Sequence, residues 1–340
     1  MKKFALAIAL VSFILVAYGQ HGPAKGDYFL LLKNQRTISV NTYKNDQLVE
    51  HTTHTINKDM IYATDGASAV ALLDTAKNDL LIFDINTLNE IRLTVPYALK
   101  TKTVFLIQGS VFIGGEMISE MLVQYHIAKD EWYALEIPEE VSLPGKAIDD
   151  IVVNENLLIA IDNLVMPKYI LCYKFSSTGS LTLSHSTMLK SNGPYESIYQ
   201  GRITNKYFGL RSGTYSGDTG ASGHISIYDG IDLKRSFAIT SGMDDKGYHT
   251  FSDFVIVEDK IVVASKEKGL GIFEIKPNYF KDTDDYGMVK FNNQVSASRI
   301  RYRKLKNGNI KKLVVIPGTT SVVLTVENNW GSIRQEIIQI

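Results

Sequence analysis

The stretch ILCYKFSSTGSLTLSH, residues 170–185, shows most clearly the pattern that decides the fold: a β-type run reaches an aromatic anchor, turns and begins another strand. Similar runs recur as ISVNTY (38–43), LLIFDI (80–85), LVQYHI (122–127), ISIYDG (225–230), LGIFEI (270–275) and, more loosely, RQEIIQI (334–340). Their anchors, which recur about every 40 to 55 residues, are Tyr43, Phe83, Tyr125, Tyr173, Tyr228 and Phe273. This interval suits a unit of four antiparallel strands, and no other common repeat of that length is all-β.

The fourth unit shows how the strands of one unit follow one another. Apolar residues alternate there or run together, and Gly, Asn and Asp mark the breaks between the runs. The strands expected in this unit cover 148–153, 157–161, 169–175 and 181–184. The same order recurs from Met60, Val104, Ser197 and Phe254. Each unit leaves hydrophobic faces that only neighbouring units can cover, so we expect the units to stack radially into one domain.

In repeat period and strand pattern, residues 20–340 resemble the β-propeller superfamily of WD40-like, kelch-like and YVTN-like exported proteins. The resemblance implies an all-β fold of four-stranded antiparallel blades. We expect seven blades, one of them closed by strands from both termini; six is the alternative, if the terminal strands share a single blade. The Gly-His…Trp-Asp pair, the kelch double glycine with its spaced Tyr and Trp, and a clean YVTN signature are not found, so no family active site carries over.

The first twenty residues, MKKFALAIALVSFILVAYGQ, have the three parts of a secretory signal. Lys2 and Lys3 form a positive region, residues 4–16 form an apolar region, and Ala17-Tyr18-Gly19 is a small-x-small cleavage site. A membrane anchor is the alternative, but a helix that spans a bilayer needs about 20 apolar residues. We therefore expect a signal peptide at 1–19 and a mature chain, 20–340, that is secreted or periplasmic and not inserted in a membrane.

Composition excludes several kinds of function. Lys plus Arg and Asp plus Glu number 36 each, so the formal net charge is zero, which argues against nucleic acid as a bulk partner. The single cysteine, Cys172, lies in an apolar run and is expected to be a buried structural thiol. Neither Gly-x-Ser-x-Gly nor His-Glu-x-x-His occurs, so serine-nucleophile and zincin chemistry have no support.

Loop lengths suggest where a partner would bind. The turns on one face of the predicted blades are tight, whereas the connections on the other face are long. These long connections are 139–146, 163–168, 190–195, 212–223 and 242–250. Long loops on a rigid scaffold are where binding concentrates, so the pattern favours the long-loop face of blades 4 to 6.

Candidate binding residues on this face combine aromatic, acidic and imidazole side chains: Tyr195, Glu196, Tyr215, Asp218, Asp244, Asp245, Tyr248 and His249. The principal hypothesis is a non-catalytic module that binds a protein, peptide or glycan and needs no cofactor. The alternative is a hydrolase- or lactonase-type enzyme, with Glu196, Asp244 or Asp245 supplying acid–base groups or holding a divalent cation.

Other polar clusters are interpreted as surface features. Residues 282–287 begin like a calcium loop, but position twelve is Asn293 instead of the bidentate Glu, which favours an exposed acidic connection. The basic run from Arg299 to Lys312 is expected to form a charged face or edge of the last blade. His51 and His54 are three apart in a predicted strand and should point to opposite faces. Trp132 and Trp330 are expected to pack between blades.

The signal peptide gives a first prediction. Residues 1–19 should be absent from the exported protein, because the cleavage site follows the apolar region directly. N-terminal sequencing or intact-mass measurement of the exported protein should place its first residue near Gln20. Exported material that still contained residues 4–16 would contradict this.

Overall fold

The computed structural model describes residues 28–107, 109–117, 120–141, 146–153, 157–162, 168–175, 181–189, 196–216, 220–230, 232–240, 243–244, 247–248, 251–265, 269–282, 299–303 and 308–340. This part of the chain is all-β apart from one short 3-10 turn, Pro277–Tyr279. A search of the same residues for a helix of sufficient length and hydropathy to cross a membrane finds none.

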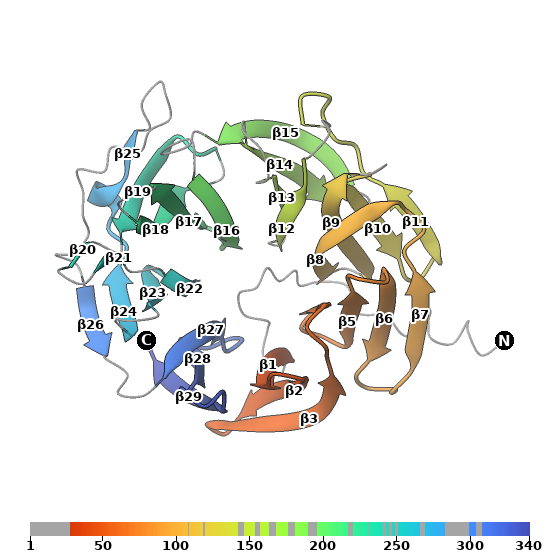
Figure 1. Ribbon diagram of the computed structural model, residues 1–340, viewed down its shortest axis with the longest axis horizontal. Helices are drawn as coiled ribbons and strands as arrows, with labels where there is room; N and C mark the ends of the chain where they lie inside the picture. Colours follow the sequence, from red (N-terminus) through yellow and green to blue (C-terminus); the bar gives the residue numbers. More distant parts are fainter. Residues whose placement is uncertain are drawn as a thin grey trace. The chain divides into compact units, whose positions relative to one another are not determined.

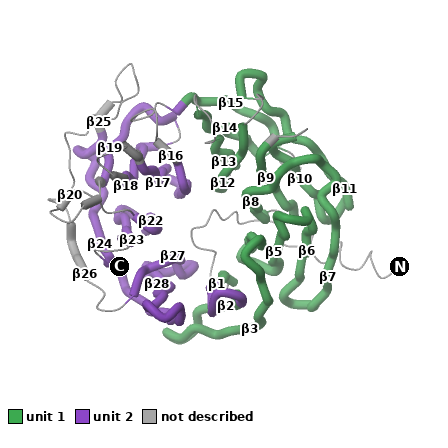
Figure 2. Tube along the Cα trace, in the orientation of Figure 1, with its two compact units in different colours: residues 1–18, 23–30, 38–188 green, residues 19–22, 31–37, 189–340 purple. Residues whose placement is uncertain are grey.

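The chain divides into two compact units (Figure 2). The first unit holds the described residues up to Met188 except Leu31–Thr37, which belong to the second unit together with Leu189–Ile340. We describe each unit by itself.

In the first unit, three four-stranded antiparallel sheets follow one another along the chain (Figure 1). Their strands are β4 (Met60–Thr64), β5 (Ala69–Asp74), β6 (Asp79–Asp84) and β7 (Glu90–Thr94); β8 (Leu99–Ile107), β9 (Ser110–Met117), β10 (Leu122–His126) and β11 (Glu131–Ala134); and β12 (Ile148–Val153), β13 (Leu157–Asp162), β14 (Lys168–Phe175) and β15 (Leu181–Leu189). They are preceded by the three-stranded sheet of β1 (Phe29–Asn34), β2 (Thr37–Lys44) and β3 (Gln47–Thr55), whose β1–β2 tip belongs to the second unit.

The second unit continues the same plan with three larger sheets and a small hairpin. The strands are β16 (Glu196–Ile203), β17 (Tyr207–Ser216), β18 (Gly220–Asp229) and β19 (Arg235–Thr240), extended by β25 (Lys281–Asp282); β22 (Phe251–Val257), β23 (Lys260–Ser265), β24 (Gly269–Glu274) and β26 (Arg299–Arg303); and β27 (Asn309–Val315), β28 (Ser321–Glu327) and β29 (Ile333–Gln339). The hairpin consists of β20 (Met243–Asp244) and β21 (Gly247–Tyr248).

Apart from that hairpin, the sheets are the blades of a β-propeller, which we number 1 to 7 in chain order. The predicted fold class and the predicted number of blades are confirmed. The repeated anchors of blades 2 to 6 lie in third strands, where all but Phe273 are buried. Tyr125 and Tyr173 are each 1% exposed, and their hydroxyl groups donate to Asp130 Oδ1 and the Glu136 carbonyl, both at 2.7 Å. Cys172 is buried, as expected.

We define the leading edge of a blade as the end at which its first strand begins. Because the strands are antiparallel, the connection from the second to the third strand lies at the same end. Strand β3 reaches blade 2 through only four residues, 56–59, and Asp59 accepts a hydrogen bond from the Thr75 N–H at the leading edge of that blade. Thus β3 ends where fourth strands end, and blade 1 consists of a second, a third and a fourth strand.

The expectation that one blade is closed by strands from both termini is wrong for the described residues. The first and last sheets are separate and three-stranded. Two hydrogen bonds from side chains link the β1–β2 tip to blade 7: Gln335 Nε2 donates to the Leu32 carbonyl at 2.7 Å, and Gln35 Nε2 donates to Glu327 Oε1 at 3.3 Å. Residues 299–303, expected at the last blade, are instead strand β26, which pairs with β24 as the fourth strand of blade 6. Blade 7 therefore has three strands.

A buried ion pair ties blades 5, 6 and 7 together. Arg202 of β16 and Asp253 of β22 are separated by 3.0 Å, and their side chains are 1% and 3% exposed. The guanidinium also donates to the Phe254 carbonyl at 3.1 Å, and Asp253 Oδ2 accepts the Leu313 N–H of β27 at 2.7 Å. Each charge is thus satisfied by several partners, as burial of a charge requires.

Removing one member of this pair should destabilise the fold strongly. Replacing Asp253 by Ala leaves the Arg202 charge and the Leu313 N–H buried without their acceptor, which typically costs about 3–5 kcal/mol of unfolding free energy. The matched control is Asp229→Ala, which breaks an exposed pair with Arg235 (3.3 Å) and should cost no more than about 1 kcal/mol. Urea unfolding measures both; equal losses would show that the buried pair does not join the blades.

Candidate functional site

The leading edges carry a recurrent irregularity, a β-bulge near the start of the first strand. In each of blades 3 to 7, the first strand contains one residue that has no opposite residue on the second strand, so the pairing register shifts by one there. The extra residues are Lys102, Asp149, Tyr199, Ser252 and Lys311. A bulge re-aims a side chain and is frequent next to binding sites. The bulges therefore place an extra side chain at the leading edge of each of these blades, and its chemistry differs between neighbouring blades.

In the first unit the bulges present paired charges. Lys102 Nζ lies 3.4 Å from Asp149 Oδ1, and both side chains are about one quarter exposed. Beneath them Lys146 and Asp162 form a buried pair at 2.8 Å, with the ammonium 5.4 Å from the Tyr169 ring centroid. Burial raises the pKa of the Asp162 carboxyl, against the opposing effect of Lys146. These charges are mutually compensated, which favours a structural role.

In the second unit the blade 5 bulge presents an exposed aromatic ring. Tyr199 is 57% exposed, although most large apolar side chains of the described residues are covered. The Arg211 guanidinium lies 5.1 Å from its ring centroid, a cation–π distance. Arg211 is itself held by hydrogen bonds from Nη1 to the Phe251 carbonyl (2.9 Å) and from Nε to Gln200 Oε1 (3.3 Å). Tyr199 is thus a supported ring that faces solvent.

The hairpin β17–β18 rises beside this ring. Strands β17 and β18 pair along their whole length, from Tyr207↔Asp229 to Ser216↔Gly220. The first strand, β16, begins only at Glu196, which lies opposite Thr214. The hairpin therefore extends beyond the first strand of its blade. The prediction of a loop at 212–223 is wrong: most of the segment is strand, and 217–219 lie outside the described residues. Glycine and serine suggested a turn, but pairing between neighbouring strands outweighs that local preference.

No protein-family model and no curated protein sequence matches this chain. Solved structures do match. The β-propeller domain of Myceliophteria thermophila Cps50 (Swd1) is 10% identical with a TM-score of 0.58, over 96% of this chain and 98% of that one. U3-55K is 11% identical with a TM-score of 0.58 (94% and 100%), and Kluyveromyces lactis Hsv2 is 14% identical with a TM-score of 0.52 (94% and 98%). The fold is a β-propeller. At these identities the likeness shows the fold alone.

The structure of the propeller accounts for only part of the predicted site. Glu196, Tyr215, Asp244 and Tyr248 lie in strands, where they pair with Thr214, Ala221, Gly247 and Met243 respectively; their side chains are outside what is described. Tyr195, Asp218, Asp245 and His249 fall outside the described residues altogether. The assignment of these eight residues to a site stays a prediction.

Tyr199 and Arg211 were missed by the sequence reasoning. In the sequence, the signal was only a Tyr followed by Gln near the start of an expected strand. The alternation of apolar and polar residues does not show whether a side chain at such a position is buried or exposed. The register shift that turns the ring outward depends on pairing with β17 and has no local signature.

Other predicted clusters are placed more simply. Within the described residues, no group of three or more His, Cys, Asp or Glu side chains is arranged to hold a metal ion. Since the side chains of Glu196, Asp244 and Asp245 are outside that search, the enzyme alternative stays a prediction. In the acidic segment, Asp282 pairs with Arg235 in the sheet of blade 5, and residues 283–298 lie outside the described part. Trp132 packs against the apolar cluster between blades 2 and 3, as expected, but Trp330 is 91% exposed.

His51 and His54 do contact different partners. His51 meets the Tyr28 ring at 4.9 Å and Thr42 Oγ1 at 2.8 Å, whereas His54 packs on Phe83 at 4.6 Å. The His54 Nε2 atom is buried without a hydrogen-bond partner among the described residues. Burial lowers the pKa of His54, and the nearby Glu90 charge opposes this only in part.

This environment predicts a pH dependence of stability. Because the folded-state pKa of His54 lies below its unfolded value, the unfolded chain binds more protons as the pH falls through about 6.5. Stability should therefore decrease towards pH 5.5. In a His54→Gln variant the decrease should be smaller, by up to about 1.4 kcal/mol for each unit of pKa shift. Urea unfolding at pH 7.5 and 5.5 measures the difference; identical slopes in both proteins would contradict the assignment.

Proposed function

We propose that this propeller is an exported binding module that holds a partner protein or peptide at the leading edge of blade 5, without catalysis. The observation that carries the proposal is Tyr199, an aromatic side chain kept 57% exposed by a bulge and supported by Arg211. Tyrosine and arginine are enriched among the residues that dominate binding energy. Glycans remain a less favoured class of ligand.

Pre-organisation supports this reading. A side chain that is already held in place loses little conformational entropy when a partner covers it, which improves affinity. Arg211 bridges β17 and β22, so the support of the ring comes from two blades. The hairpin β17–β18 lies beside the ring, and the predicted residue Tyr215 belongs to its first strand.

A structural neighbour offers a precedent for this kind of role. The N-terminal domain of Nup159 is 13% identical to this chain with a TM-score of 0.51, over 96% of this chain and 89% of that one. A further match contains Saccharomyces cerevisiae Dbp5 bound to Nup159 and Gle1. Export rests on the predicted signal peptide, and a soluble exported scaffold with a rigid exposed aromatic is suited to capturing another extracellular chain.

The test is capture of a partner by purified residues 20–340 from the extract or medium in which the protein occurs naturally. Tyr199→Ala should lower the recovery of the partner by at least tenfold, because an interface anchor contributes about 2 kcal/mol or more. Its melting temperature should stay near that of the parent, since exposed side chains contribute little to folding.

Tyr133→Ala is the matched control. Tyr133 is a 38% exposed tyrosine on β11, far along the chain from the site, and its removal should leave capture unchanged. Quantitative mass spectrometry of the captured proteins compares the three samples. If Tyr199→Ala retains the same partner at the parental level, the leading edge of blade 5 is not the binding surface.

A further inference from the structure

Trp330 is the most exposed large apolar side chain of the described residues. It is 91% exposed, whereas the next value, for Leu88, is 66%. Trp330 lies in the turn between β28 and β29 at the leading edge of blade 7, and we call residues 328–332 the β28–β29 tip. A ring of this size is ordinarily covered by a core or an interface. Folding alone therefore does not explain its position.

Hydrogen bonds within the β28–β29 tip fix the backbone that carries this ring. Asn328 Oδ1 accepts the N–H groups of Trp330 and Ser332, both at 2.9 Å. The Asn328 N–H donates to the Ser332 carbonyl at 2.9 Å, and the Gly331 N–H donates to the Asn328 carbonyl at 3.0 Å. Gly331 has a φ of +78°, which glycine adopts without a steric penalty. The ring is thus displayed on a closed, hydrogen-bonded turn.

The β1–β2 tip lies beside the β28–β29 tip and belongs to the same compact unit. Gln35 Nε2, which donates to Glu327, would lie 3.2 Å from a Cβ atom placed on Gly331. The Arg36 N–H donates to Asn34 Oδ1 at 2.8 Å and thereby closes the turn of this second tip. Both tips therefore contribute to one surface at the leading edge.

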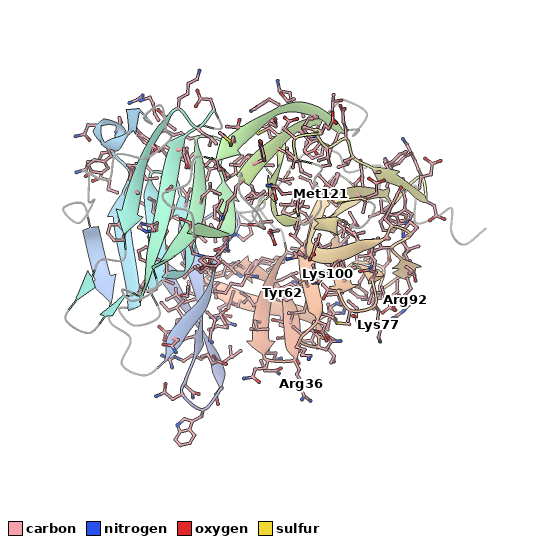
Figure 3. All side chains as sticks on the ribbon, turned by 45° about the horizontal axis from the view of Figure 1, so that its top comes forward. Arg36, Tyr62, Lys77, Arg92, Lys100 and Met121 are labelled. Carbon is pink, nitrogen blue, oxygen red and sulfur yellow. The ribbon has the colours of Figure 1, made fainter. Side chains whose placement is uncertain are left out.

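This surface is positively charged. Arg36 is exposed and extends away from the sheet (Figure 3), and its guanidinium forms no ion pair within the described part of the chain. Lys33 is a second exposed cation on the same tip. The nearby carboxylate, Glu327, has a side chain that is only 20% exposed, and Lys311 neutralises it at 2.6 Å. An exposed indole ring therefore lies close to a net positive charge.

The exposure of the ring limits the kind of partner that can cover it. A side chain that is 91% exposed has few neighbouring atoms on either face, so it is not the wall of a preformed pocket for a small ligand. A protein anchor lies among other residues that exclude water from it. The neighbours of Trp330 are instead polar, among them Asn34, Gln35, Asn328 and Asn329.

The headgroup region of a lipid bilayer matches these properties. It is fluid, so it can close around a projecting side chain, and it leaves neighbouring amide groups in contact with water. Tryptophan is enriched at this depth because its ring is apolar and its indole N–H can donate. Lys and Arg side chains close to the surface of a bilayer are attracted by anionic headgroups.

We propose that the two tips attach the protein reversibly to the surface of a membrane that contains anionic lipids. Trp330 inserts among the headgroups, and Arg36 binds their phosphate groups through its guanidinium. The attachment needs no spanning segment and is weak, because one ring and a few charges provide it. The site does not include Tyr199, so either proposal can fail without the other.

The experiment mixes the purified mature protein with vesicles of phosphatidylcholine, either alone or with phosphatidylglycerol as the anionic lipid. Co-sedimentation gives the partition coefficient, and tryptophan emission reports the environment of the ring. The chain has only two tryptophans, and Trp132 is packed in the cluster between blades 2 and 3. Anionic vesicles should therefore shift the emission of Trp330 to shorter wavelength, and added salt should weaken the binding.

Two substitutions test the roles of the tips. Trp330→Ala should lower the partition coefficient by about tenfold or more, because it removes the burial of a large apolar side chain. Its melting temperature should stay near that of the parent, since the ring contributes little to folding. Arg36→Gln should lower binding to anionic vesicles about fivefold, because one attraction to the charged surface is lost.

Matched controls lie elsewhere on the molecule. Tyr133→Ala removes an exposed aromatic side chain of blade 3, and Lys234→Gln removes an 80% exposed cation in the turn between β18 and β19. Both variants should bind the vesicles as the parent does.

Several results would overturn the proposal. These are no binding of the parent protein, equal binding of Trp330→Ala, and equal binding to neutral and anionic vesicles. An emission shift that grows with protein concentration in the absence of lipid would identify a second copy of the chain as the occupant. A shift caused by a soluble acidic polysaccharide but not by vesicles would identify a glycan instead.

Discussion

A single sheet of this protein cannot bury its own faces, and every other feature depends on the way neighbouring sheets cover them. In the first unit, one apolar cluster joins blades 2 and 3 and another joins blades 3 and 4. In the second unit, corresponding clusters join blades 5 and 6 and blades 6 and 7. Burial of this apolar surface is the main favourable term in folding, at roughly 25 cal/mol for each Å². It explains why a second strand such as β5 is buried along its whole length and why exposure alternates along a fourth strand such as β7.

Because apolar contacts between the faces of the sheets hold the blades together, the residues at the ends of the strands can differ from blade to blade. The leading edges use this freedom through one device, a residue inserted near the start of the first strand, and the inserted side chain changes from blade to blade. Lys102 and Asp149 neutralise each other, whereas Tyr199 stays exposed above Arg211. A rigid scaffold with variable ends is the general reason why propellers serve as binding modules. In this chain the bulge of blade 5 is the position where the inserted residue is an exposed aromatic ring.

The sequence was informative where a local pattern carries the information. The spacing of anchors such as Tyr125 and Tyr173 predicted seven repeats, because an anchor of this kind recurs in the third strand of successive blades. The sequence was misleading where the structure depends on pairing between residues that have no recognisable local signal for it. Lys146 was assigned to a surface loop, yet it is buried through its contact with Asp162, and no nearby residue indicates this partner. Similarly, the glycine-rich stretch 212–223 has the composition of a loop but largely forms strands, since each half is paired along its length with the other.

The placement of the β1–β2 tip has a consequence for how the protein reaches its native state. Leu32 and Gln335 hydrogen-bond across 303 positions of sequence, and Leu31–Thr37 belong to the same compact unit as Leu189–Ile340. During synthesis the tip is made well before Glu327 and Gln335, with which it forms hydrogen bonds. Contacts of such high sequence separation slow folding, because a long loop must close before they form. The β1–β2 tip therefore cannot complete its packing until Glu327 and Gln335 have been synthesised, and its strands stay incompletely covered until then.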